Sequence, residues 1–163
     1  MGAAPVTAQI DVVPRKRGSG VTLRRAMLGE CERVYAYNAA ADVRALSGKP
    51  TPILLGDHEM WFARRIADVS SPFWIIEDDG VPVGSVRIDA RADMNARISI
   101  ALDSSARGRG IGRRAIVLAC ADWRGIVVAE IHEGNAQSRA CFTACGFVQM
   151  GKHDAFDVYQ WSP

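Results

Sequence analysis

The sequence has few of the residues on which metal centres and disulfide frameworks depend. Its 163 residues include three histidines and four cysteines, and no two cysteines (Cys31, Cys120, Cys141 and Cys145) have the C-x-x-C spacing of a zinc site. Cys141 and Cys145 are four residues apart on an expected helix, and we interpret them as small buried hydrophobes. We expect no metal and, because no secretory leader is recognisable, a reducing, cytoplasmic location.

Long apolar runs and a strong net charge are also missing. No hydrophobic stretch approaches the ~20 residues that cross a bilayer, so we expect no membrane contact. The formal net charge of +2 provides no basic field for nucleic acid. The length fits one domain, and a hydrophobic content of 48% is enough for a core. Arginine greatly outnumbers lysine, and outside residues 107–114 this excess fits biased genomic composition better than phosphate recognition.

Residues 1–20 show no sustained hydrophobic period and contain the basic cluster Arg15-Lys16-Arg17. A solvated tail explains such a cluster better than a nucleic-acid contact does. We therefore expect a flexible N-terminal tail over residues 1–20 and a single domain over residues 21–163.

Hydrophobic periodicity in the remainder predicts alternating strands and helices. Asp78-Asp79-Gly80 is a hairpin signal between two strands. Residues 42–50 read as a loop or short turn, and Gly56-Asp57 reads as the N-cap of the helix that follows. Strands are expected near residues 21–24, 72–77, 81–88, 95–102, 126–132, 147–150 and 156–161, and helices near 27–40, 57–66, 111–123 and 135–145. The helix between the strands at 95–102 and 126–132 predicts that these two are parallel neighbours or near-neighbours.

Residues 106–114, Ala-Arg-Gly-Arg-Gly-Ile-Gly-Arg-Arg, join the strand at 95–102 to an apolar helix, and we call them the glycine-arginine turn. Three glycines in five residues allow backbone to approach a ligand closely, and the helix start presents unpaired N–H groups. Together with four arginines, these features predict a phosphate cradle. A dinucleotide-binding G-x-G-x-x-G would need glycine at Arg113, and the Gly-Lys-Ser/Thr of a P-loop is absent.

Two motifs in this order of elements resemble the GNAT family of acetyl-CoA-dependent amine acetyltransferases. The first is the family's acyl-CoA loop, Arg/Gln-x-x-Gly-x-Gly/Ala, present here as residues 107–112. The second is residues 135–147, with an asparagine, an alanine, an aromatic residue and the closing Gly146-Phe147. The resemblance spans roughly residues 21–161.

The resemblance implies an α/β fold with a mixed, mostly antiparallel sheet of six to seven strands and about four helices. It also implies acetyl-CoA as the acyl donor, no metal, a small-molecule amine as acceptor, and a monomer or homodimer. A backbone amide near Ala101 or Leu102 would stabilise the oxyanion. The residues implied to hold the donor are Ile100, Ala101, Leu102, Arg107, Gly108, Arg109, Gly110, Ile111, Gly112, Arg113, Asn135, Ser138 and Phe142. Asn135 could contact the pantetheine arm, cap its helix or do both.

Two residues of the strand at 126–132 are candidates for catalysis. Glu130, five residues before Asn135, matches a position that serves as a base in some family members, directly or through water. It could equally be a half-buried carboxylate paired with an arginine. His132 lies on the same strand face and could relay a proton, although a structural histidine is the simpler interpretation.

Phe142 departs from the family pattern, because many relatives carry at this position a tyrosine proposed to protonate the coenzyme A thiolate. Phenylalanine has no proton to donate. Another group or water must act instead, or the step needs no acid, since a thiolate with a pKa near ~8.5 is a tolerable leaving group. A non-catalytic acyl-CoA-binding module therefore stays open as an alternative.

The acceptor depends on a narrower resemblance over residues 38–76. That stretch looks like the branch that acetylates the 4-amino group of nucleotide-linked dideoxy sugars in pseudaminic-acid-type pathways, and it overlaps the ribosomal-protein N-terminal acetyltransferases. The expected acceptor is an amino-sugar nucleotide, with a protein N-terminus or small amine as the alternative. The family places its second helix over the substrate, so His58, Glu59 and Trp61 would line the acceptor pocket. Asp57 and Glu59 could instead simply favour the helix start.

Overall fold

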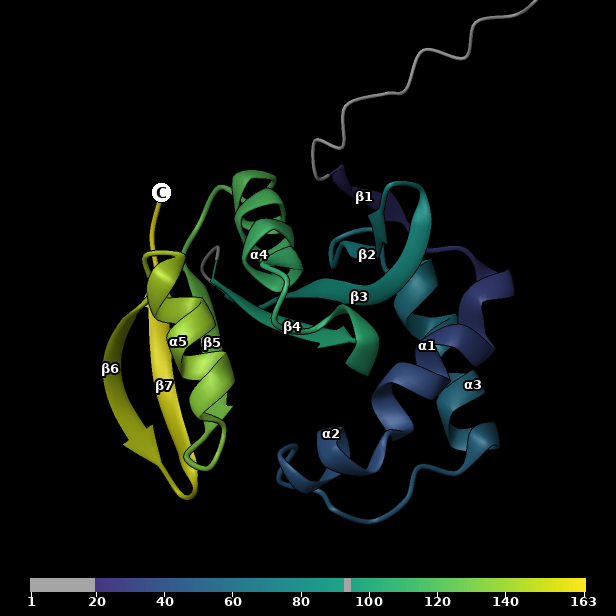
Figure 1. Ribbon diagram of the computed structural model, residues 1–163, viewed down its shortest axis with the longest axis horizontal. Helices are drawn as coiled ribbons and strands as arrows, with labels where there is room; N and C mark the ends of the chain where they lie inside the picture. Colours follow the sequence, from purple (N-terminus) through teal and green to yellow (C-terminus); the bar gives the residue numbers. More distant parts are fainter. Residues whose placement is uncertain (1–19, 93–94) are drawn as a thin grey trace, which may run out of the picture.

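The computed structural model describes residues 20–92 and 95–163, which form one mixed sheet of seven strands with helices packed on it (Figure 1). The expected α/β fold is confirmed, whereas the predicted tail lies outside the described residues except for Gly20. The elements are β1 (Val21–Arg25), η1 (Leu28–Glu30), α1 (Cys31–Ala39), α2 (Ala41–Ala45), α3 (Leu55–Ala67), β2 (Phe73–Asp78), β3 (Val81–Ala90), β4 (Ala96–Leu102), η3 (Ser104–Ala106), α4 (Ile111–Ala121), β5 (Val127–His132), α5 (Ala136–Ala144), β6 (Val148–His153) and β7 (Phe156–Trp161).

Strands β2 and β3 form a hairpin whose turn is at Asp79-Gly80. Asp79 and Gly80 both have positive φ, 51° and 80°, which suits the tight turn that matches the twist of two antiparallel strands. The predicted hairpin is therefore confirmed.

Two helix boundaries differ from the expectation. Residues 41–45, expected as a loop or short turn, form the single-turn helix α2, which tertiary contacts hold: Asp42 forms an ion pair with Arg107 of the glycine-arginine turn. Helix α3 begins at Leu55 rather than after Gly56-Asp57, and no side chain caps it. Asp57 lies in the first turn of α3, where its charge favours the helix dipole.

The strand order is β1-β2-β3-β4-β5-β7-β6, and every neighbouring pair is antiparallel except β4 and β5. The expected parallel relation of these two strands is confirmed. Their register consists of only two pairs, Ala96↔Val127 and Arg97↔Val128, after which the strands part. The sheet is thus open in its middle on the carboxyl side of β4 and β5.

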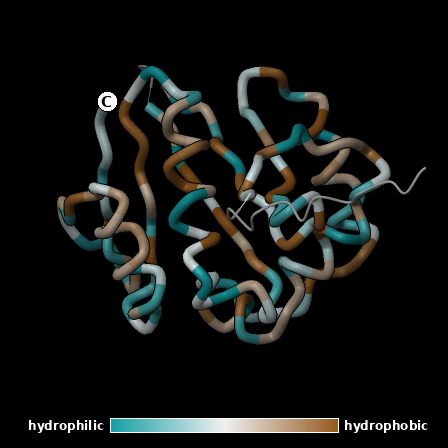
Figure 2. Tube along the Cα trace, turned by 45° about the horizontal axis from the view of Figure 1, so that its top comes forward, coloured by the Kyte–Doolittle hydropathy of each residue, from teal (hydrophilic) through white to brown (hydrophobic). Residues whose placement is uncertain are grey.

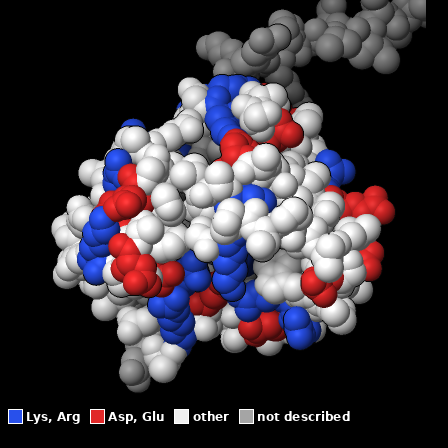
Figure 3. All heavy atoms as spheres, turned by 90° about the horizontal axis from the view of Figure 1, so that it is seen from below, with Lys and Arg blue, Asp and Glu red and all other residues white. Residues whose placement is uncertain are grey.

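Hydrophobic segments follow the central strands, whereas many turns are hydrophilic (Figure 2). Charged side chains lie on the surface, and from below the basic ones gather in the middle of the face with acidic ones among them (Figure 3).

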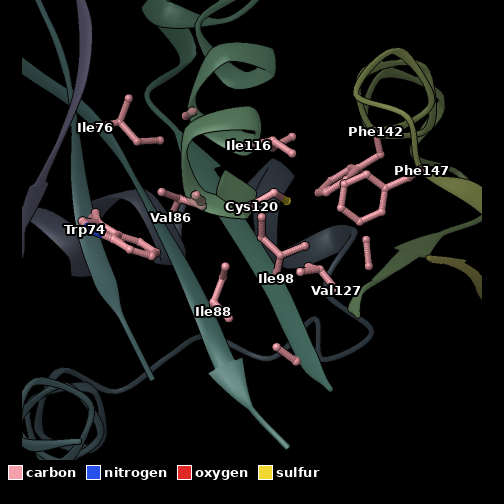
Figure 4. Close-up of a cluster of buried hydrophobic side chains, with 14 of the residues drawn as sticks. Trp74, Ile76, Val86, Ile88, Ile98, Ile116, Cys120, Val127, Phe142 and Phe147 are labelled. Atoms are coloured by element: carbon pink, nitrogen blue, oxygen red, sulfur yellow. The ribbon is translucent and has the colours of Figure 1, made fainter. Parts of the chain in front are cut away.

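The two faces of the sheet have different cores because alternate strand residues point to opposite sides. Helices α4 and α5 cover one face, where Ile88, Ile98 and Ile116 belong to the larger core (Figure 4). Helices α1 and α3 cover the other face, where Phe62 and Ile75 belong to a smaller core. The residues directly before and after Ile88 on β3, and directly before and after Ile98 on β4, therefore point toward the side of α1 and α3.

Candidate functional site

A cavity of about 680 Å³ lies where β4 and β5 part. Its walls come from the two strands, the glycine-arginine turn, the start of α5 and helix α2. The turn after α2 closes one side: a Cβ on Gly48 would lie 2.6 Å from the Phe156 ring of β7, which shows how closely this turn rests on the β6–β7 hairpin. The parting of the strands therefore produces a chamber rather than a surface groove.

The edge of β4 that faces the cavity carries backbone groups without a strand partner, and of these Leu102 O accepts from Arg107. Ala96 N–H donates to Ile126 O on the β5 side, whereas Asp103 N–H donates to Val83 O on the β3 side. Since backbone direction alternates along a strand, the polar groups of Ile100 and Leu102 face the cavity, beyond the last β5 pair. Of the two amides expected to stabilise an oxyanion, Leu102 is thus on the cavity side, and Ala101 faces β3.

The glycine-arginine turn presents backbone N–H groups at one end of this edge. Gly108 and Gly110 have left-handed φ of 71° and 76°, and Gly110 is the N-cap of α4, which has no side-chain cap. A Cβ on Gly112 would lie 3.3 Å from Leu102 Cδ1 and 3.7 Å from Cys141 Sγ. The first two glycines are therefore required by the backbone path and the third by close packing, and the N–H groups at the start of α4 are left for a ligand.

The arginines of the turn act differently from the expectation that all meet phosphate. Arg107 donates through Nε and Nη2 to Leu102 O, at 3.2 and 3.1 Å, and forms an ion pair with Asp42. Arg109 lies outside the cavity lining and donates to Asp78 Oδ2 at 2.7 Å. Arg113 lines the cavity. Two of the guanidinium groups therefore hold the turn against β4, α2 and β2.

Helix α5 contributes its first turns to the cavity. Asn135 Oδ1 accepts a hydrogen bond from Ser138 N–H at 3.0 Å, so the expected capping role is confirmed. Asn135, Ser138 and Phe142 all line the cavity. Phe142 is buried edge-on against Phe147, with ring centroids 5.0 Å apart, and brings no hydroxyl to the chamber.

Glu130 lines the cavity from β5 and is held by two guanidinium groups. Its Oε1 lies 3.1 Å from Arg91 Nη2 and its Oε2 lies 3.3 Å from Arg97 Nη2, and its side chain is 18% exposed. The paired-carboxylate interpretation is therefore correct. A role as base is still compatible with this position, because the carboxylate borders the chamber.

His132 borders the same chamber two residues further along β5. Gly134 N–H donates to its Nδ1 at 3.1 Å, and the ring lies edge-on against Phe156. A nitrogen that accepts this bond carries no proton, so the neutral ring has its proton on Nε2. In this tautomer Nε2 can donate a hydrogen bond but cannot accept a proton.

The three residues expected to line the acceptor pocket do not do so. His58 is 3% exposed, bonds Cys31 O through Nε2 at 3.1 Å and stacks on Phe62, and burial lowers its pKa. Glu59 is exposed on α3, and Trp61 packs on Phe73. The face of α3 that carries His58 turns toward α1, so His58 and Trp61 pack with Phe62 in the smaller core, and Glu59 faces solvent.

Arg87 of β3 and Arg97 of β4 line the cavity in their place, and sequence reasoning missed both. The sequence does contain a pattern that could have identified them. Each arginine alternates with core residues along its strand, as Arg87 does between Val86 and Ile88. Such a position predicts a side chain on the opposite face of the sheet, but what that face meets is decided by α1, α2 and α3.

Cys141 and Cys145 lie on one face of α5, but they are partly exposed rather than buried. A hydrogen bond with Cys145 and the positive charge of Arg113 lower the pKa of Cys141 to about 7, and the same pairing raises that of Cys145. Cys141 lines the cavity. Its thiol therefore lies beside the glycine-arginine turn, where the positive charge of Arg113 favours the thiolate.

Within residues 20–92 and 95–163, no group of three or more His, Cys, Asp or Glu side chains is placed to hold a metal ion. Nor does any helix in that part of the chain have the length and apolar character needed to span a membrane.

Comparisons with solved structures find the same fold elsewhere. A domain from Methanocaldococcus jannaschii superposes with a TM-score of 0.77 at 21% identity, over 88% of this chain and 98% of that one. Spermidine N-acetyltransferase from Vibrio cholerae, in complex with CoA and spermine, has a TM-score of 0.73 at 18% identity, over 86% and 92%. An aminoglycoside acetyltransferase in complex with coenzyme A has a TM-score of 0.73 at 16% identity, over 88% and 95%. At these identities the likeness establishes the fold.

No curated protein matches the chain. The family comparison is decisive by contrast, because the acetyltransferase (GNAT) domain model matches residues 21–148 and thus covers both the open middle of the sheet and the glycine-arginine turn. The protein therefore belongs to the GNAT acetyltransferase family.

Proposed function

We propose that this acetyltransferase transfers the acetyl group of acetyl-CoA to the primary amine of a nucleotide-linked amino sugar. The observation that carries the proposal is the chamber between β4 and β5, with unpaired N–H groups of α4 at one end and arginines at the other. A long donor can lie along the strand edge while an acceptor enters from the side of α2.

The residues around the chamber fit such a donor. The N–H groups at the start of α4 would bind its pyrophosphate, and Arg113 would add a positive charge. The open β4 edge at Ile100 and Leu102 would pair with its amides, as a strand pairs with its neighbour. When bound, acetyl-CoA supplies an activated acetyl thioester.

The chain must remove a proton from the amine and stabilise the negative charge on the carbonyl oxygen. Leu102 N–H, on the cavity side of β4, would donate to that oxygen. Glu130 would accept the amine proton, directly or through water, while Arg91 and Arg97 orient its carboxylate. His132 Nε2–H would donate a hydrogen bond at this end, and the departing thiolate would take its proton from water, because Phe142 has no hydroxyl to supply one.

The sugar-nucleotide acceptor is supported by the chemistry of the wall opposite the glycine-arginine turn. Phe156 offers a ring for stacking, and Lys49, Arg87 and Arg97 offer positive charge for a diphosphate. An enzyme that acetylates a peptide N-terminus would be expected to have an open, acidic groove, whereas this wall is basic. We therefore place a protein N-terminus or a simple small amine second, and a non-catalytic acyl-CoA-binding module third.

Release of free thiol from acetyl-CoA across a panel of amines tests the proposal. We expect turnover with a nucleotide-linked amino sugar and a much lower rate with a peptide. Glu130→Gln should lower kcat by about 100-fold or more, most strongly at low pH, where more of the amine is protonated. Glu59→Gln, an exposed change outside the chamber, is the matched control.

Unchanged turnover in Glu130→Gln would remove Glu130 from catalysis. Saturable binding of CoA with no thiol release from any amine would favour the binding module over the enzyme.

A further inference from the structure

Arg87 and Arg97 lie on adjacent strands and share one face of the sheet. In the β3–β4 register Arg87 is opposite Ser99 and Arg97 is opposite Asp89. One residue pair, Ile88 and Ile98, lies between these two pairs, so both arginines are on the same face. Neighbours such as Val86 and Ile98 point into the core under α4, so the two arginines point to the other side, where both line the chamber. We call them the arginine pair.

Among residues 20–92 and 95–163, acidic groups do not balance the charge around the arginine pair. Glu130 is shared by Arg91 and Arg97. Asp89 is shared by Arg87, whose Nε is 3.2 Å from Oδ1, and by Arg65. In this part of the chain two carboxylates thus serve four guanidinium groups, and a further one, Asp68, contacts Arg65 at 3.8 Å.

The chamber as a whole has the same imbalance. Among the residues that the structure describes, its lining contains five lysines and arginines and two acidic residues, and both acidic residues are already paired, Asp42 with Arg107 and Glu130 with Arg91 and Arg97. Basic side chains gather in the middle of the lower face (Figure 3).

The arginine pair is also incompletely hydrogen-bonded. Arg97 Nε is cut off from solvent and has no hydrogen-bond partner among the described residues. The Arg87 side chain is only 23% exposed, and burial, together with the charges of Arg65 and Arg97, lowers its pKa to about 10. Desolvated guanidinium groups that lack full pairing are stabilised by any oxyanion that reaches them.

Trp61 holds Arg87 in a defined orientation. The Arg87 guanidinium lies over the indole ring, 5.2 Å from its centroid. Stacking of this kind fixes the plane of the guanidinium, which leaves its remaining N–H groups directed for bidentate recognition of a planar carboxylate or of two phosphate oxygens.

We propose that the arginine pair binds an oxyanion on the acceptor, so that this enzyme acetylates anionic amines. The proposal rests on the proposed function and deepens it, because it names the charge that the acceptor must carry. The anion can be a phosphate, as in a sugar nucleotide, or a carboxylate, as in an amino acid. A polycation of the kind bound in the spermidine N-acetyltransferase structure would be repelled.

Matched amines that differ only in an anion provide the test. Thiol release is measured with glucosamine and glucosamine 6-phosphate, with alaninamide and alanine, with a uridine-diphosphate-linked amino sugar and with spermine. The anionic member of at least one pair should have the higher kcat/KM, and the pair that shows it identifies phosphate or carboxylate as the source.

Variants then assign the preference to the arginine pair. Arg87→Gln should reduce kcat/KM for the anionic amine by about 30-fold or more, while the loss for its neutral partner is much smaller. Arg97→Gln also removes an ion pair of Glu130, so it should lower kcat/KM for both amines, and for the anionic one more. Arg87→Lys, which keeps the charge without the fork, should fall between. Arg64→Gln, an exposed arginine of α3 outside the chamber, should leave the ratio as it is. Thermal denaturation checks that each variant is folded.

A binding measurement separates this inference from the proposed function. Tryptophan fluorescence, reporting on Trp61, is followed while glucosamine 6-phosphate or alanine is added to the protein saturated with CoA. Saturable binding that Arg97→Gln abolishes supports the arginine pair even if no amine is acetylated. Equal kcat/KM within both pairs, or a preference for spermine, would overturn it even though acetylation itself stands.

Discussion

Substitution of Gly110 tests whether the glycine-arginine turn contacts a ligand. Gly110 has φ +76° at the N-cap of α4, and a Cβ built on it meets no atom within 4 Å. An alanine there adds backbone strain of about 1–2 kcal/mol without a steric clash. For a domain of this size, 1 kcal/mol corresponds to a shift in Tm of about 2–4 °C.

Tryptophan at the same position carries the same backbone strain but also fills the space in front of the α4 N–H groups. If a pyrophosphate binds there, Gly110→Trp removes at least two charge-assisted hydrogen bonds of about 1.5–3 kcal/mol each. The affinity for CoA should therefore fall by more than about 100-fold.

Gly80 provides the matched control, because it has φ +80°, no atom within 4 Å of its Cβ position, and a place in the β2–β3 turn away from the chamber. Gly80→Ala and Gly80→Trp should lower Tm and leave CoA affinity unchanged. Thermal denaturation and calorimetric titration with CoA measure the two quantities. Normal CoA affinity in folded Gly110→Trp would refute the assignment of the turn to the pyrophosphate.

Two further predictions follow from shifted pKa values. The rate of Cys141 alkylation by iodoacetamide should rise with a midpoint near pH 7, and CoA should slow the reaction. The midpoint should move to higher pH in Cys145→Ala, which removes the hydrogen-bond donor; an unchanged midpoint would contradict the contact with Cys145, and a rate that CoA leaves unchanged would contradict the place of Cys141 in the chamber. Burial lowers the pKa of His58 below its usual value of 6.5, so the unfolded chain binds more protons, and the free energy of unfolding is highest above pH 6.5 and falls as pH drops toward the folded pKa. Urea denaturation should show a flatter pH profile in His58→Gln, whereas exposed His153→Gln should keep the slope.

Local signals predicted the parts of the fold that local chemistry controls. The β2–β3 hairpin follows from Asp79 and Gly80, and the parallel relation of β4 and β5 follows from the helix that joins them. The capping role of Asn135 was predicted for the same reason, since Asn accepts a bond from an N–H three residues on.

The acceptor wall could not be predicted in this way. His58 and Trp61 lie on a helix whose buried side depends on how α3 packs on α1, and that packing turned His58 toward Cys31. Arg107 has the pattern of a phosphate ligand, but its partner Asp42 is 65 residues away in sequence. Contacts over such a distance leave no periodicity to detect.

The sequence by itself determined the family resemblance and the order of the strands and longer helices, because glycine spacing, capping and alternation act over a few residues. Only the tertiary structure decided where β4 and β5 part, which arginines bind the protein rather than a ligand, and that Arg87 and Arg97 meet in the chamber. The charge balance of a cavity depends on side chains from elements that are distant in sequence, and these side chains become neighbours only when the chain folds.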